Sequence, residues 1–262
     1  MKDEPSKTYA SLLLESVGYT VTQIPVSQEP NEERADLMAV IQDDDILIVE
    51  AKGKEPHEAY LHLIAQAETR GVATCSRRIT PWSALSSVIA KATRQLQATP
   101  APNIAPRVLL ISCIHDDWSY VLDAFQYRLY GEVELALWRR TVGMPAQAGT
   151  LPCFYYDSSE FCRHRTLDAV ILGGPAGQML LVNEFGERVM HLRKSRLYSE
   201  ALDAQGLCDP EVKRANGEAI AVLAADVLGE RERWQYLLDT YGFMTNVMTR
   251  NQFNALAIIP LH

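Results

Sequence analysis

The chain has 262 residues, with 25 Lys and Arg against 33 Asp and Glu, and 47% of its residues are hydrophobic. This composition excludes a disordered or fibrous chain and is typical of a globular protein with a net charge of −8. Its apolar runs are far shorter than the roughly 20 residues that cross a bilayer. The first ten residues do not resemble a secretory signal, so we expect a cytoplasmic protein with no membrane partner.

The first half of the chain alternates between strand and helix patterns, which favours an α/β fold with a central mixed sheet flanked by helices. The predicted elements are, in chain order, a helix at 6–17, a strand at 19–26, a hairpin of strands 35–41 and 46–52, a helix at 56–70, a looser stretch to residue 81, a helix at 82–96, a strand at 108–113, a helix at 119–130 and a strand at 132–138.

The second half has weaker patterns. Residues 143–149 are typical of a linker, strands are predicted at 167–172 and 178–182, and a helical end is predicted over 210–241. The segment GGPAG at 173–177 lacks the Lys-Ser/Thr ending of a phosphate loop, which favours a hairpin turn. We therefore expect a core domain at 1–142 and a C-terminal α+β region at 143–262, which completes the same domain or mediates oligomerisation.

The charge is unevenly distributed along the chain. Residues 69–107 contain six basic side chains and no acidic one, although the protein as a whole is acidic. Such a segment can follow a nucleic-acid backbone, and its candidate binding residues are Arg77, Arg78, Lys91 and Arg94. A second basic cluster at 188–196 could line the same groove. The alternative for both clusters is an ordinary solvated surface.

Two charged residues interrupt the apolar strand at 46–52. Glu50 and Lys52 share one face, about 7 Å apart, because side chains alternate along a strand. Burying a charge costs several kcal/mol per ion, so charges in a largely buried strand indicate a partner or a chemical task.

Asp36 opens the preceding strand, and the hairpin register decides where it lies. A loop of odd length places Asp36 opposite Glu50 or Lys52, whereas an even loop turns it to the other face. With the odd register, Asp36 and Glu50 form a carboxylate pair able to hold Mg²⁺, with the Ala51 carbonyl as a further oxygen ligand.

This pattern resembles the PD-(D/E)xK nuclease superfamily, in which an Asp at the start of one strand precedes Glu-x-Lys on the next. Here Asp36 is followed after thirteen residues by Glu50-Ala51-Lys52, with Ala35 in the place of the proline. The resemblance covers about residues 6–113 and includes an insertion at 53–82.

The resemblance implies a restriction-endonuclease-like core and further site residues. A glutamate on the first helix, here Glu15, would be a metal ligand. A polar residue on the helix after the motif, here Gln95, would belong to the catalytic set. Lys91 precedes Gln95 by four residues, so both lie on one helix face.

The activity implied is metal-dependent hydrolysis of phosphodiester bonds. Asp36 and Glu50 would hold Mg²⁺, for which Mn²⁺ would substitute, and Lys52 would stabilise developing charge or orient the attacking water. The expected protein is a DNA endonuclease of defence, restriction or repair, with a homodimer or partner subunit left open.

Two other functions remain as alternatives. The first is a noncatalytic protein of the same fold that binds nucleic acid or a protein partner and keeps the charged trio as a structural ion pair. The second is a nucleotide-binding regulatory domain around residues 173–177.

Overall fold

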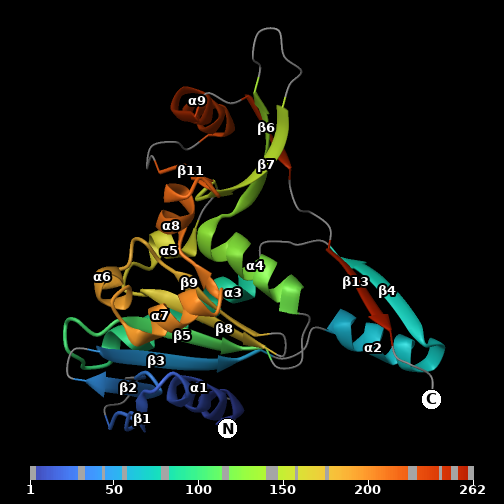
Figure 1. Ribbon diagram of the computed structural model, residues 1–262. Coiled ribbons are helices and arrows are strands. Elements are labelled where there is room, and N and C mark those ends of the chain that lie inside the picture. The colour runs from blue at the N-terminus through green and yellow to red at the C-terminus, as the bar shows by residue number, and fades with distance from the viewer. Residues whose placement is uncertain are drawn as a thin grey trace.

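The fold is α/β and is built on a mixed sheet of seven strands flanked by helices (Figure 1). A computed structural model describes residues 4–28, 33–42, 45–54, 58–77, 83–113, 118–139, 147–156, 159–174, 177–223, 229–241, 244–248 and 253–258. Within these ranges, no helix combines the length and apolar character needed to pass through a bilayer.

The helices and strands have the following bounds. The helices are α1 (Glu4–Ser16), α2 (Glu58–Arg70), α3 (Ser83–Ala98), α4 (Trp118–Tyr130), α5 (Glu160–Arg163), α6 (Val189–Leu192), α7 (Arg196–Asp203), α8 (Pro210–Ala215) and α9 (Glu230–Tyr241). The strands are β1 (Thr20–Gln23), β2 (Leu37–Gln42), β3 (Asp45–Gly53), β4 (Val72–Arg77), β5 (Arg107–Ser112), β6 (Val133–Arg139), β7 (Gln147–Phe154), β8 (Ala169–Gly174), β9 (Gly177–Val182), β10 (Leu207–Cys208), β11 (Ile220–Ala221), β12 (Met244–Met248) and β13 (Phe253–Ile258).

The large sheet has the order β1-β2-β3-β5-β8-β9-β10. Strands β3, β5 and β8 are parallel neighbours, whereas β1, β2 and β3 form an antiparallel meander. Strands β8 and β9 form an antiparallel hairpin in which Gly174 pairs with Gly177, which confirms the hairpin predicted around GGPAG. Strands from both sides of residue 142 therefore lie in one sheet.

Each face of this sheet carries its own hydrophobic core. On one face, α1 and α7 cover Leu47, Val49 and Ala51 of β3. On the other face, α3 and α4 cover Ile48 of β3 and Leu109 of β5. Because both faces are covered, β3 is buried over most of its length, and any charged side chain on it must find a partner inside the protein.

Two smaller sheets lie outside the large one in Figure 1. Strands β11, β7, β6 and β12 form a four-stranded sheet, and β4 pairs with β13. Strand β4 lies in the stretch predicted to be loose, and β11 interrupts the region predicted to be helical. The partners of these strands lie far away in the chain, so the local periodicity does not report them.

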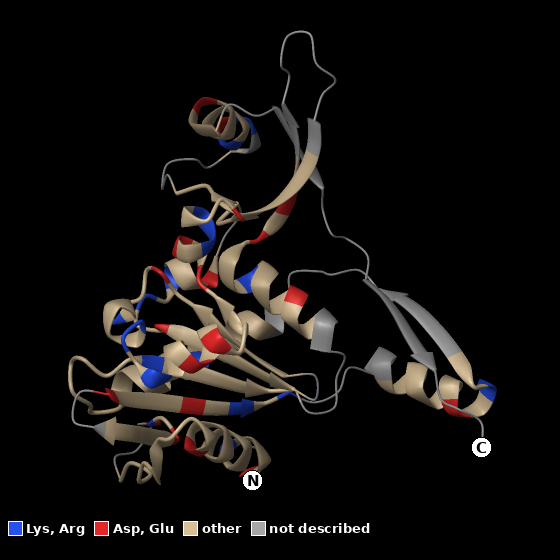
Figure 2. Ribbon diagram, in the orientation of Figure 1, with Lys and Arg blue, Asp and Glu red and all other residues tan. Residues whose placement is uncertain are grey.

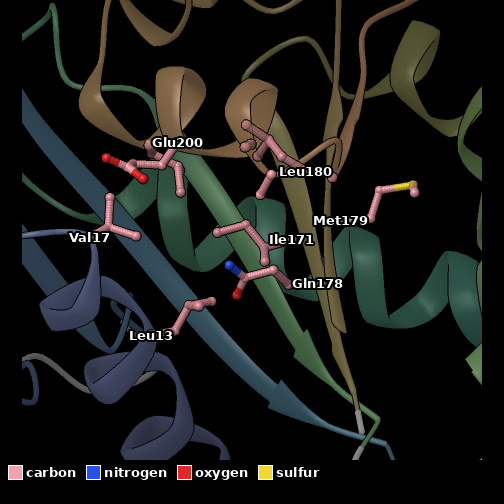
Figure 3. A pocket seen from close by; sticks show the side chains of 11 residues that line it. Leu13, Val17, Ile171, Gln178, Met179, Leu180 and Glu200 are labelled. Carbon is pink, nitrogen blue, oxygen red and sulfur yellow. The ribbon is translucent and has the colours of Figure 1, made fainter. Parts of the chain in front are cut away.

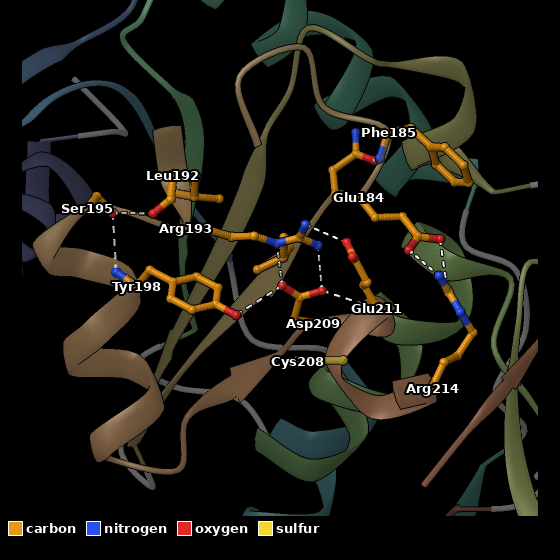
Figure 4. A network of polar contacts seen from close by, with 12 residues as sticks. Glu184, Phe185, Leu192, Arg193, Ser195, Tyr198, Cys208, Asp209, Glu211 and Arg214 are labelled. Atoms are coloured by element: carbon orange, nitrogen blue, oxygen red, sulfur yellow. Dashed lines mark hydrogen bonds and ion pairs between the residues drawn. The ribbon is translucent and has the colours of Figure 1, made fainter. Parts of the chain in front are cut away.

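A buried ion pair holds the segment before α7 against the start of α8 (Figure 4). Asp209 is 1% exposed, and Arg193 donates to its two carboxylate oxygens over 2.9 and 3.0 Å. The Tyr198 hydroxyl and the Glu211 N–H also donate to this carboxylate, each over 3.1 Å. The carboxylate therefore has hydrogen-bond donors from three other residues, as a buried charge requires.

A β-bulge in the β2–β3 hairpin sets the register on which Asp36 depends. Gln42 pairs with Asp45, but Val40 pairs with Ile46, so Ile41 is an extra residue on β2. Without this bulge, the two residues between Gln42 and Asp45 would give an even loop and would place Asp36 opposite Ala51. The bulge shifts the pairing by one residue and produces the register of an odd loop.

We predict that deleting Ile41 preserves the fold, because only the unpaired residue is removed and the pairing from Leu37 to Val40 stays the same. The free energy of unfolding in urea should change by about 1 kcal/mol or less. Deleting the buried Ala39 from the same strand should cost more, since a larger side chain would then enter its place in the core. Equal losses for the two deletions would contradict this account of the bulge.

Candidate active site

Asp36 immediately precedes β2 and lies close to Glu50. The β2–β3 ladder begins where Leu37 pairs with Val49, and the Asp36 N–H donates to the Val49 carbonyl over 3.2 Å. The charge of Asp36 acts on the Glu50 carboxyl group, so the two acidic side chains lie near each other. Two acidic residues fourteen positions apart in sequence are thus neighbours across the hairpin.

Asp36 directly precedes the first residue of β2, and its carboxylate has two partners. Its Oδ2 accepts a hydrogen bond from the Ala51 N–H over 3.0 Å, and its Oδ1 lies 2.8 Å from Nζ of Lys7. The N–H and carbonyl of one strand residue point to the same side, so the Ala51 carbonyl is directed to the Asp36 edge of β3. This edge therefore presents a carboxylate and a main-chain oxygen together.

Glu50 is completely buried in an apolar setting. Its side chain is 0% exposed, with Ile48 before it on the same face of β3 and Leu109 beside it on β5. Lys52 Nζ lies 2.6 Å from Oε1, and the Lys52 side chain is 17% exposed. Oε2 of Glu50 accepts no hydrogen bond from the residues that the structure describes.

The environment of Glu50 favours its protonated form. Burial raises the pKa of Glu50 to about 7, and the charge of Asp36 raises it further, whereas the contact with Lys52 acts in the opposite direction. Near neutral pH the carboxyl group therefore exchanges a proton. Because buried polar atoms in proteins are almost always paired, the unpaired Oε2 indicates a site for a proton or a cation.

Helix α1 brings Lys7, which the sequence analysis did not single out, to this pair. A Cβ on Gly53 would lie 2.5 Å from the Ser6 hydroxyl, so the start of α1 packs closely on the end of β3. The hydrogen bond to Asp36 raises the pKa of Lys7. Lys7 could have been found only from the packing direction of α1, since a lysine in a first helical turn carries no motif.

Glu15, the metal ligand implied by the resemblance, lies elsewhere on α1. It is exposed and follows Lys7 by eight residues, or about 12 Å along the helix axis. The chain after α1 reaches the opposite end of β3, where the Tyr19 hydroxyl donates to Asp45. Helix α1 thus contributes Lys7 to the charged cluster and places Glu15 away from it.

Helix α3 places Lys91 and Gln95 beside the segment that leads into β2. Lys91 Nζ lies 3.0 Å from Glu33, and two turns later the Thr99 hydroxyl accepts from the Ala35 N–H over 2.7 Å. Gln95 lies between them on the same face, and its Oε1 is buried with no hydrogen-bond partner among the described groups. The helix therefore presents an amide close to the segment that leads into β2, on the side of the sheet that holds Glu50.

The predicted nucleic-acid-binding residues are placed only in part. Arg94 is exposed on α3, as is Lys91, whose side chain is 50% exposed. Arg78 and the side chain of Arg77 lie outside the described residues.

Most members of the second basic cluster are paired with acidic side chains. Figure 2 colours the basic and acidic positions along the ribbon. Arg188 pairs with Glu187, Arg193 with Asp209, and Arg196 with Glu200. The same figure shows an acidic and then a basic segment near the end of β3, while most of the strand is uncharged.

The oxygen atoms near Asp36 and Glu50 are of the type that binds a divalent cation. Carboxylate and carbonyl oxygens are the ligands that Mg²⁺ prefers, and Glu50 offers one oxygen that no described group uses. Within the described ranges no cluster of three His, Cys, Asp or Glu side chains surrounds such a position. Asp36, Glu50 and the Ala51 carbonyl would therefore hold the ion together with water, as is usual for Mg²⁺.

Two cavities lie away from this cluster. The first is a hollow of about 20 Å³ between α1, β8, β9 and α7, lined mainly by aliphatic side chains such as Leu13, Ile171 and Leu180 (Figure 3). It has room for a single water molecule. The second is an open cavity of about 570 Å³ near the hairpin turn, lined by Asp45, Lys194 and their neighbours.

Comparisons with protein-family models, with curated proteins and with solved structures find no match to this chain.

We predict that Glu50→Gln changes the free energy of unfolding more favourably at pH 8 than at pH 4, by about 3 kcal/mol. The folded protein binds a proton at Glu50 between the unfolded pKa of 4.5 and the folded value of about 7. The stability of the wild type therefore falls across this range, and the full cost is present above pH 7. The neutral amide removes that cost. Urea unfolding at several pH values measures the difference.

Glu15→Gln provides the matched control, because Glu15 is exposed on α1. Its effect on the free energy of unfolding should stay within about 0.5 kcal/mol at every pH. A Glu50→Gln effect that does not change with pH would show that the pKa of Glu50 is the same in the folded and the unfolded protein.

Proposed function

We propose that this protein is a metal-dependent nuclease with a restriction-endonuclease-like core, acting on DNA. The observation that carries the proposal is the buried Oε2 of Glu50, which has no hydrogen bond among the described residues and lies near Asp36 and Lys52. A carboxylate pair with a lysine can support phosphodiester hydrolysis with a divalent cation.

The order of the elements supports the same proposal. An initial helix, an antiparallel hairpin carrying the acidic residues, a later helix and a parallel strand appear here as α1, β2, β3, α3 and β5. This is the order that the resemblance implies. The insertion expected at 53–82 contains α2 and β4.

Each residue of the cluster has a task in the proposed reaction. Asp36 and Glu50 bind the cation, and the Ala51 carbonyl lies at the same edge. A bound Mg²⁺ would neutralise charge on the phosphate and lower the pKa of a coordinated water. Lys52, which is partly exposed, donates hydrogen bonds to a phosphoryl oxygen or orients the water. Gln95 positions the water or the cation ligands through its side-chain amide.

One observation favours the noncatalytic alternative. The cluster contains two acidic and two basic side chains, paired as Lys7–Asp36 and Lys52–Glu50, so it is neutral without any cation when Glu50 is ionised. A neutral set of ion pairs can serve structure alone. The absence of cleavage with every metal and substrate would favour this function, in which the fold binds nucleic acid or a protein.

We predict that the purified protein cleaves plasmid or linear DNA with Mg²⁺ or Mn²⁺ and that a chelator abolishes cleavage. Lys52→Ala should lower the cleavage rate by about a hundredfold or more, comparable to the loss of one charge-stabilising donor. Asp36→Asn should lose divalent-cation binding together with cleavage, because an amide is a poorer Mg²⁺ ligand. Calorimetry with Mg²⁺ and gel-based cleavage rates distinguish the two variants.

Arg231→Ala is the control for these variants, since Arg231 is an exposed basic residue on α9, outside the charged cluster and outside both basic segments. It should cleave at the wild-type rate. Undiminished cleavage by Lys52→Ala would refute the proposed site even if the wild type is a nuclease.

We also predict that Lys91 and Arg94 contact the DNA backbone. Replacing both with Ala should weaken binding and reduce the slope of log K against log salt by about 2, because each phosphate contact releases about one counterion. Binding measured at several salt concentrations tests this expectation. An unchanged slope would assign both side chains to the solvated surface.

A further inference from the structure

We propose that Lys7 competes with the divalent cation for Asp36 and must leave this carboxylate before the ion binds. The inference rests on the proposed function, since it concerns the same cation site. It assigns to α1 a positively charged residue that regulates access to the site, where the resemblance implies an acidic ligand.

The contacts of Asp36 favour this competition. Its Oδ1 lies 2.8 Å from Lys7 Nζ, and its Oδ2 accepts from the Ala51 N–H. Both carboxylate oxygens therefore already have partners. The main-chain N–H is fixed in β3, so the lysine is the partner that can move away when a cation binds.

The charges point in the same direction. Lys7 experiences the negative charges of Glu4 and Glu50 in addition to that of Asp36. With Lys52 on Glu50, the four side chains at the carboxylate pair are neutral in sum. A divalent ion between the carboxylates would lie close to both ammonium groups, and the repulsion would weaken its binding until Lys7 moves.

The packing of α1 keeps the backbone of Lys7 in place but leaves its side chain an exit. The Ser6 hydroxyl contacts the Ser112 hydroxyl at 3.2 Å, and a Cβ on Gly173 would lie 2.3 Å from the Tyr9 hydroxyl. Ser6 and Tyr9, which lie on either side of Lys7 along α1, are thus packed against the ends of β5 and β8. The Lys7 side chain itself is 30% exposed, so its ammonium group can turn to solvent.

Released from Asp36, the lysine remains at the edge of the cation site. An ammonium group there attracts a phosphate, so the same residue that opposes the free ion favours the ion together with a phosphodiester. Lys7 would therefore weaken binding of the free cation and strengthen binding of the cation together with the substrate.

The test is the affinity of the protein for Mn²⁺ alone, measured by calorimetry at constant pH. Lys7→Ala should bind Mn²⁺ about tenfold more tightly than the wild type, because the competing charge is gone. Lys7→Arg keeps the charge and should bind like the wild type. Arg231→Ala removes an exposed positive charge on α9 and should also leave the affinity unchanged.

The outcomes distinguish this inference from the proposed function. If the wild type binds Mn²⁺ and Lys7→Ala binds it equally well or more weakly, Lys7 does not compete with the cation. The nuclease proposal would then remain intact. Binding by Lys7→Ala alone would support the competition. If neither protein binds Mn²⁺ at the concentrations at which carboxylate pairs bind this ion, both the competition and the proposed function are overturned.

Discussion

The burial of the Glu50 carboxylate is the constraint around which this part of the structure is arranged. A charge inside an apolar sheet requires compensation within a few ångströms, and each neighbouring element supplies part of it. Strand β3 provides Lys52, the hairpin provides Asp36 with its own lysine from α1, and α3 closes the same face. Oε2 of Glu50 has no hydrogen bond from the part of the chain that the structure describes, so the compensation by these residues is incomplete. Incomplete compensation at one atom is typical of a position where a ligand or proton completes the site.

The hairpin and its charged residues could be predicted from the sequence, because both depend on local patterns. Alternation along β3 placed Glu50 and Lys52 on one face, and turn residues marked the hairpin. The register of Asp36 could not be predicted, since it depends on whether Ile41 is paired or bulged. The energy difference between these two pairings comes from the core on the far face of the sheet, which no local pattern contains.

Long-range contacts explain the other differences between the structure and the predictions from sequence. Lys7 reaches Asp36 only because α1 packs antiparallel to β3, and the sequence alone gives no packing direction. Strand β4 pairs with β13, near the other end of the chain, and β10 joins the large sheet through β9. The seven-stranded arrangement thus required the complete topology, although the α/β class followed from the alternation of elements.

The two outer strands of the large sheet are short: β1 has four residues and β10 has two. An outer strand exposes unpaired N–H and C=O groups along its free side, and long ones tend to recruit another chain. Here few such groups are available at either end of the seven strands. A second copy that extended this sheet would therefore gain few main-chain hydrogen bonds. Self-association by continuous sheet formation through these two ends of the large sheet is therefore disfavoured.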